Sequence, residues 1–188
     1  MFRPGRVGIS AGGVAVEWYC LMVRTGCEAE FKERAGAALA ACGIEGRLYF
    51  FQRKFSRGRE GIIDAPLFPG YLFLQVEELS AEVIGLVKAV RNFCHLLPAN
   101  DRPQAIRGAA LEELKLFMGH GECFGISRVA FLPGRRIRAI SGPMVGLEGS
   151  VYKVNKKKRR ITVVSSLSPD GKKFDLLYEE VEPLEGWV

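Results

Sequence analysis

The sequence predicts an α+β protein, an α/β sandwich followed by a small β-barrel, and three observations support this. Segments with strand and helix periodicity alternate up to about residue 118, as in layered α+β domains. From residue 128 onward, short strand-like runs are separated by Gly and Pro turns, which is typical of small barrels. Between them the periodicity fails, with Gly119, Gly121 and Gly125 in quick succession.

These observations place the domain boundaries. We expect a first domain at residues 17–118, a flexible linker at 119–127 and a second domain at 128–188. Residues 1–16 lack the apolar core of a secretory signal and are predicted to be a disordered extension.

Composition narrows the class of protein. Of the 188 residues 48% are hydrophobic and 26% charged, which is enough for packed cores and argues against a disordered chain. The five cysteines are odd in number and scattered, so we expect free thiols in a reducing cytoplasm. No apolar run approaches the ~20 residues of a membrane helix, and we therefore expect a cytoplasmic protein away from membranes.

The first domain should open with a buried strand at 17–23. A helix should start at Thr25, which with Glu28 forms a capping-box pattern, and should end at Gly43. The other expected elements are strands at 48–55, 71–76 and 93–97, a long connection at 56–69, and helices at 80–90 and 109–118.

The second domain contains the most informative run, residues 131–149. Gly134, Gly142, Gly146 and Gly149 interrupt alternating apolar and basic residues, which is typical of tightly turned barrel strands. The Gly142-Pro143 step fixes one turn. An ordinary Gly-rich loop is the alternative interpretation. Further turns are expected around Asn155 and at residues 169–171.

Positive charge is concentrated in this second domain. Residues 127–173 hold 12 basic and 2 acidic side chains, whereas the last fifteen residues hold five acids and no Lys or Arg. Such density is typical of polyanion binding, and a solvated basic face is the alternative. The candidate nucleic-acid contacts are Arg135, Arg136, Arg138, Lys153, Lys156, Lys157, Lys158, Arg159, Arg160, Lys172 and Lys173.

A second motif lies in the first domain, at Phe68-Pro69-Gly70-Tyr71. Pro and Gly make a stiff turn that can present aromatic rings to a partner protein. The same residues could instead be the core of a tight strand entry.

Together, the Trp18-Tyr19 opening, the Phe68–Tyr71 turn and the Gly142–Gly146 core of a KOW motif resemble the NusG family of transcription factors, from about residue 17 to 183. The resemblance implies a ferredoxin-like NGN domain, a flexible linker and an SH3-like KOW barrel. It also implies binding to the clamp helices of the largest RNA polymerase subunit through Trp18, Tyr19, Phe68 and Tyr71. Such a factor suppresses pausing by binding alone, so we expect no catalytic residue, metal or cofactor. The resemblance also implies a monomer that is nucleoid-associated during transcription.

The chain departs from the housekeeping pattern of that family. Its loop at residues 166–171 lacks the aromatic residue that contacts ribosomal protein S10 or Rho, which puts both partners in doubt. The basic hairpin at 153–160 more closely resembles LoaP-type antiterminators, which implies recognition of an RNA hairpin. Two alternatives remain: a housekeeping factor that couples polymerase to the ribosome or Rho, and an RfaH-type factor that a DNA element recruits. The candidate contacts to non-template DNA are Arg53, Lys54, Arg57 and Arg59.

Other classes find less support. His120-Gly121-Glu122 imitates a zinc-deaminase motif but lacks the following Pro-Cys-x-x-Cys. His95 beside Cys94 has no third partner at triad spacing, so a core or edge histidine is expected. A ribosomal protein that docks a KOW barrel on RNA is a further alternative, against which the preceding α/β domain argues.

Overall fold

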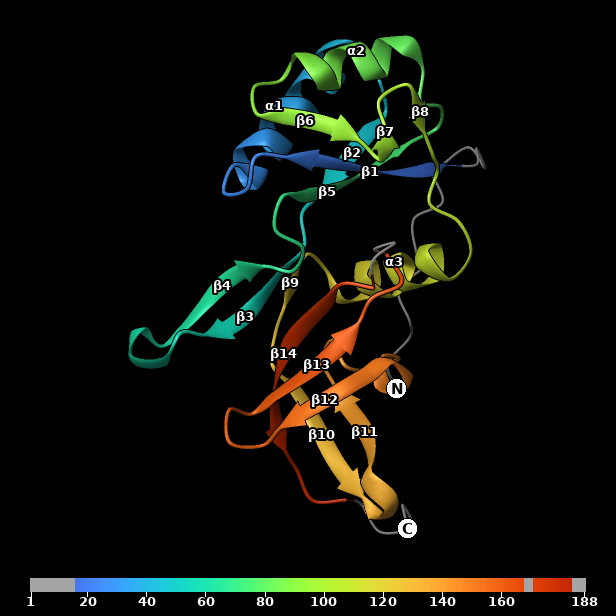
Figure 1. Cartoon of the computed structure of the whole chain (residues 1–188). Coiled ribbons are helices and arrows are strands. Elements are labelled where there is room, and N and C mark those ends of the chain that lie inside the picture. Colours follow the sequence, from blue (N-terminus) through green and yellow to red (C-terminus); the bar gives the residue numbers. More distant parts are fainter. Residues whose placement is uncertain (1–15, 168–170, 184–188) are drawn as a thin grey trace. The chain divides into compact units, whose positions relative to one another are not determined.

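The computed structural model describes residues 16–167 and 171–183 and confirms a mixed α+β protein (Figure 1). The chain forms two compact units, each described separately below, and neither is continuous in sequence. Unit 1 comprises residues 1–50 and 68–111, and unit 2 comprises residues 51–67 and 112–188.

Unit 1 is built on a four-stranded sheet with the order β2-β5-β1-β6. The predicted strands at 17–23 and 71–76 are confirmed as β1 and β5, which pair antiparallel with Leu21 opposite Leu72. The elements are β1 (Glu17–Val23), α1 (Glu28–Ala41), β2 (Gly46–Tyr49), β5 (Tyr71–Val76), α2 (Ala81–Ala89), β6 (Phe93–Leu96), β7 (Pro98–Ala99) and β8 (Arg102–Pro103).

The helices α1 and α2 lie on one face of this sheet (Figure 1). Helix α1 buries Phe31, Ala35 and Leu39, which are spaced by four residues and so share one side of the helix. These side chains pack with Leu21 and Leu72 of the central strands in one hydrophobic core. Val83 and Val87 of α2 are buried in the same core, so unit 1 is held by two helices that pack against one sheet.

The start of α1 differs from the predicted capping box. The N-cap is Cys27, without a side-chain cap, and not Thr25. The buried Glu28 carboxylate instead accepts hydrogen bonds from the backbone N–H groups of Gly26 and Gly70, both at 2.7 Å. Glu28 thus fixes the turn before β5 to the start of α1, a long-range role that local spacing could not reveal.

Unit 2 contains a five-stranded sheet with the order β11-β10-β14-β13-β12 and a three-stranded sheet with the order β4-β3-β9. Most of α3 also belongs to it. The elements are β3 (Gln52–Ser56), η1 (Gly58–Glu60), β4 (Ile62–Pro66), α3 (Gly108–His120), β9 (Cys123–Phe124), β10 (Ser127–Leu132), η2 (Pro133–Arg135), β11 (Arg136–Ser141), η3 (Glu148–Ser150), β12 (Val151–Asn155), β13 (Arg160–Val164) and β14 (Lys173–Glu180).

Aromatic packing explains why unit 2 reaches back into the first half of the chain. The rings of Phe51, Phe124 and Phe174 all contact Phe117 of α3, with centroids 5.7, 5.2 and 5.9 Å from its ring. Strand β3 also pairs with β9, and the Gln52 N–H donates to the Glu122 carbonyl at 2.7 Å. The hairpin of β3 and β4 therefore shares a core with the C-terminal sheet.

This division differs from the predicted domain boundaries. The expected strand at 48–55 is two strands, β2 in unit 1 and β3 in unit 2, and the expected connection at 56–69 contains η1 and β4. Residues 119–127, predicted as a linker, hold the end of α3, strand β9 and the first residue of β10. Of the glycines there, Gly119 lies within α3, and Gly121 has a φ of +80° directly after the helix.

Candidate nucleic-acid interface

The glycine motif of residues 142–148 builds the turn that leads from β11 towards β12. Gly142 has a φ of +84°, and a Cβ there would lie 2.8 Å from the Ser127 Cα atom, so only glycine fits. The buried Ser127 hydroxyl accepts a hydrogen bond from the Met144 N–H at 3.0 Å. Glu148 accepts from the N–H groups of Gly146 and Ala139 at 2.8 and 3.2 Å. These residues shape the sheet that presents the basic groups.

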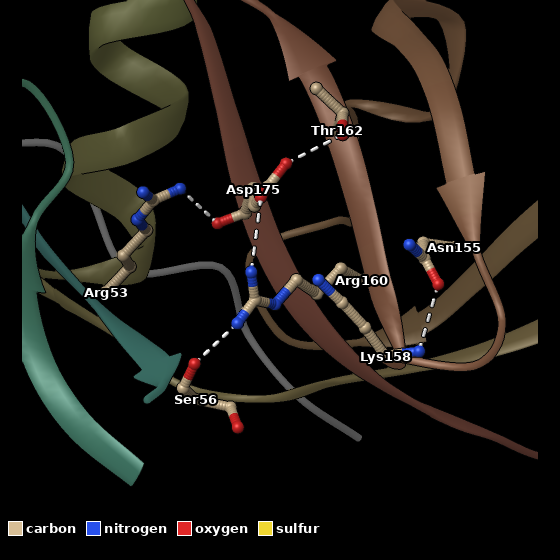
Figure 2. Close-up of polar contacts among 7 residues, drawn as sticks. All are labelled: Arg53, Ser56, Asn155, Lys158, Arg160, Thr162 and Asp175. Carbon is tan, nitrogen blue, oxygen red and sulfur yellow. Dashed lines mark hydrogen bonds and ion pairs between the residues drawn. The ribbon is translucent and has the colours of Figure 1, made fainter. Parts of the chain in front are cut away.

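The predicted turn at Asn155 is confirmed and positions the lysines. The Asn155 side-chain oxygen accepts a hydrogen bond from the Lys158 N–H at 3.0 Å (Figure 2). Arg159 has a φ of +49°, and its N–H donates to the Lys156 carbonyl. Lys156, Lys157, Lys158 and Arg159 are all exposed on this turn. A polar cap thus holds a compact cationic loop between β12 and β13.

Arg160 follows this loop but has an internal role. Its guanidinium donates to the Ser56 carbonyl at 2.5 Å and lies 3.9 Å from the Asp175 carboxylate (Figure 2). It also lies 4.3 Å from the centroid of the Phe55 ring. Asp175 also accepts from the Thr162 hydroxyl at 2.7 Å. Arg160 therefore ties the β3–β4 hairpin to the sheet of unit 2 and is not part of the exposed basic loop.

Arg53 is engaged in the same network. Its guanidinium donates to the Asp175 backbone carbonyl at 2.5 Å and lies 5.2 Å from the Phe55 ring. Burial lowers the pKa of Arg53, and the neighbouring Arg160 charge acts in the same direction. The remaining candidates for DNA contact differ: Lys54 pairs with Asp64 at 2.8 Å, Arg57 pairs with Glu60 at 3.4 Å, and Arg59 is exposed.

The other basic candidates lie on or directly before β11, β12 and β14 of the five-stranded sheet, of which β14 is the central strand. Arg136 and Arg138 are exposed on β11, and Lys153 is exposed on β12. Lys172 is half-buried, and Lys173 is exposed with its Nζ atom 3.5 Å from the centroid of the Tyr152 ring. The backbone of Arg135 lies in η2, and its side chain is outside what the structure describes.

Sequence reasoning missed Tyr152, which is 61% exposed. A shift of register between Val151 and Lys153 interrupts the pairing of β12 with β13. Because a bulge breaks the alternation of side chains, Tyr152 and Lys153 are both exposed although they are adjacent. A large aromatic residue next to a lysine run was the available signal, but its exposure depends on the bulge.

The four aromatic residues predicted to bind polymerase lie in unit 1, and most of them are buried. Trp18, Tyr19 and Phe68 are buried, and Tyr71 is half-buried. Trp18 packs on Tyr49 with ring centroids 5.2 Å apart, and Phe68 packs on Phe73 at 6.1 Å. The Tyr71 N–H donates to the Phe68 carbonyl at 3.1 Å, which closes the predicted turn.

Tyr19 makes a testable contribution to alkaline stability. Burial, together with a 2.5 Å hydrogen bond to Glu17, raises the pKa of Tyr19 from 10.0 to about 12. Folding therefore favours the protonated phenol, and this contribution is complete below pH 10 and lost as the pH rises through about 12. We expect wild type to lose stability more steeply than Tyr19→Phe over that interval in urea unfolding. Equal slopes for the two proteins would contradict the expectation.

Within residues 16–167 and 171–183, no cluster of three or more His, Cys, Asp or Glu is arranged to hold a metal ion. The imitation motif at His120 lies at the end of α3, where the imidazole Nε2 is 3.3 Å from the Val145 carbonyl. In the same described ranges, no helix has the length and apolar character needed to cross a membrane.

Comparisons with known proteins agree with this architecture. Residues 16–115 match the model of the NusG family, described as transcription termination factor nusG. The transcription termination/antitermination protein NusG of Thermus thermophilus is 23% identical over 168 residues, covering 82% of this chain and 91% of that protein. A solved structure of Thermotoga maritima NusG superposes with a TM-score of 0.54 at 19% identity, covering 88% of this chain and 96% of that one. The chain thus belongs to the NusG family of transcription termination and antitermination factors.

Proposed function

We propose that the chain is a specialised antitermination factor that a structured RNA element recruits to RNA polymerase. In this proposal the NGN region binds the clamp helices of the largest polymerase subunit, and the basic KOW barrel binds an RNA hairpin. The bound factor suppresses pausing and termination without chemistry of its own. Membership of the NusG family supports the transcriptional role.

The observation that carries the RNA assignment is the cationic loop at the β12–β13 turn. Three consecutive lysines, Lys156 to Lys158, are exposed there, and the Asn155 cap fixes the backbone between them. Ammonium groups clustered at a fixed turn can contact several phosphates at once. A fixed loop also loses less conformational entropy on binding than a mobile lysine run would.

The contacts of the β3–β4 hairpin favour RNA over DNA as the recruiting element. Of the four candidates for DNA contact, Arg53 is half-buried and bonded to Asp175, and Lys54 and Arg57 have carboxylate partners. Phosphate binding there would have to compete with these internal partners. At the β12–β13 turn, Lys156 lies 3.6 Å from the Glu180 carboxylate and 4.3 Å from the centroid of the Phe131 ring, and Lys157 and Lys158 are exposed.

On the polymerase side, the Phe68–Tyr71 turn remains the proposed contact. Tyr71 would be its principal side chain because Trp18, Tyr19 and Phe68 are buried. Gly70, with a φ of +83°, and the Glu28 carboxylate that accepts its N–H hold the turn in place. The buried aromatics would then support the shape of the surface.

The test is fluorescence anisotropy of the whole chain against a pool of RNA hairpins and matched DNA duplexes over a range of salt. The whole chain is used because unit 2 includes residues 51–67. We expect selective RNA binding, and we expect Lys156→Gln, Lys157→Gln and Lys158→Gln together to flatten the log–log salt slope by about two to three units.

A matched control removes the same charge from unit 1. Arg24, Lys88 and Arg91 are exposed there, and their replacement by Gln should leave the salt slope nearly unchanged. Equal effects of the two triple variants would indicate a general charge effect and contradict the proposed site. Preferential binding of wild type to duplex DNA would instead support recruitment by a DNA element.

A further inference from the structure

A groove opens in the five-stranded sheet of unit 2, with a volume of about 600 Å³. Its apolar lining includes Phe131 of β10, Ile137 of β11 and Val154 of β12. Strands β11 and β12 are the two ends of the sheet order, so the sheet curls until both ends border one groove. The volume falls within the ~300–1,000 Å³ typical of small-molecule pockets, which leaves room for a nucleotide.

Tyr152 stands at the rim of this groove with an accessible ring. It is 61% exposed, and the bulge in β12 exposes it together with its neighbour Lys153, which also lines the groove. The Lys173 ammonium lies 3.5 Å from the ring centroid and so occupies one face. A cation on one face holds the ring and leaves a flat apolar surface for a second stacking partner.

A second pairing of lysine and aromatic ring lies in the same groove. The Lys156 ammonium is 4.3 Å from the centroid of the Phe131 ring, and Phe131 packs on Tyr178 at 5.5 Å. Both lysines that line the groove, Lys153 and Lys156, carry positive charge at its rim. Aromatic rings beside positively charged side chains match the flat bases and the anionic backbone of a nucleic acid.

We propose that this groove binds an unpaired RNA base, which stacks on Tyr152 while Lys153 and Lys156 contact the adjacent phosphates. The inference depends on the proposed RNA-binding function and specifies which part of the RNA this face takes. In a duplex the bases are stacked inside the helix, whereas loops and bulges offer bases that can be splayed onto aromatic side chains. The groove would therefore read the loop of a hairpin while the β12–β13 turn follows its backbone.

The test compares Tyr152→Ala and Tyr152→Phe in the whole chain. The probes are a stem–loop RNA with 2-aminopurine in a uridine-rich loop and a blunt RNA duplex of the same stem. We expect Tyr152→Ala to bind the stem–loop at least about fivefold more weakly, the lower end for loss of one stacked base, and to bind the duplex unchanged. Tyr152→Phe should stay within about twofold of wild type, because it keeps the ring.

The fluorescence of 2-aminopurine provides a second readout. Stacking on Tyr152 should change the loop signal on binding of wild type and Tyr152→Phe, and this change should be lost with Tyr152→Ala. Because Tyr152 is exposed, the variants should keep the wild-type thermal unfolding midpoint. Exposed Ile62, on the β3–β4 hairpin, provides a matched control, since Ile62→Ala should leave both signals unchanged.

Three outcomes would overturn the inference, and they differ in what else they affect. If Tyr152→Ala binds the stem–loop as well as wild type does while the lysine variant is weaker, the groove takes no base but RNA binding stands. If wild type binds neither RNA, the proposed function fails as well. A Tyr152-dependent affinity for oligoglutamate that equals that for the stem–loop would identify an acidic peptide as the occupant.

Discussion

Replacing Phe124 by Ala is expected to destabilise unit 2 by about 3–5 kcal/mol, the usual cost of deleting a buried aromatic side chain. Phe124 is fully buried, and its ring lies 6.0 Å from Phe51 and 5.2 Å from Phe117. Its loss leaves a cavity among rings contributed by both stretches of unit 2. Urea unfolding of Phe124→Ala against wild type measures the loss.

Hydrogen exchange of the same variant tests whether the β3–β4 hairpin belongs to unit 2. The amides of β3 and those of the five-stranded sheet should lose protection together, because both depend on the Phe117 and Phe124 cluster. Ile62→Ala is the control; this exposed residue lies on the same hairpin and should cost no more than about 0.5 kcal/mol. Protection of β3 that follows unit 1 instead would contradict the division into units.

Replacing Gly142 by Ala is expected to cost about 3 kcal/mol, for two reasons that add. The φ of +84° is unfavourable for any L side chain, and the new Cβ would lie 2.8 Å from the Ser127 Cα and 2.9 Å from the Ile126 carbonyl. Both obstacles are backbone atoms and cannot rotate away. The turn and its Ser127 to Met144 hydrogen bond would have to shift.

Gly149→Ala is the matched control for this prediction. Gly149 has no atom within 4 Å of its would-be Cβ and no positive φ, so its replacement should change the unfolding free energy by no more than about 0.5 kcal/mol. Thermal and urea unfolding of both variants provide the comparison. Equal stabilities would mean that the motif turn tolerates a side chain and that its glycine is not required by packing.

Much of the fold could be predicted because its signals are local. Nearly continuous apolar runs indicated β1 and β5, and Gly142-Pro143 and Asn155 marked turns of the C-terminal sheet. That the β3–β4 hairpin belongs to unit 2 could not be predicted from such local signals. It depends on contacts of Phe51 and Arg53 with residues more than sixty positions away, which leave no periodic trace in the sequence.

In the candidate site, too, the features set by local sequence could be predicted and those set by long-range contacts could not. Exposure of Lys156 to Lys158 followed from a polar run bounded by a turn residue, which the sequence shows directly. The internal role of Arg160 did not, because its neighbours Ser56 and Asp175 come from other strands. Tyr152 was missed because strand alternation assigns one of two adjacent residues to the interior, and only the bulge exposes both.

The two outer strands of the five-stranded sheet also bear on how copies of this chain behave towards one another. Within the described residues the sheet ends at β11 and β12, whose outer backbone groups could pair with a strand of another molecule. Charged side chains on such strands oppose that association, and Arg136, Arg138 and Lys153 are exposed there. The same cations that suit a polyanion would thus protect the protein from aggregation, and variants that remove them should be handled at low concentration.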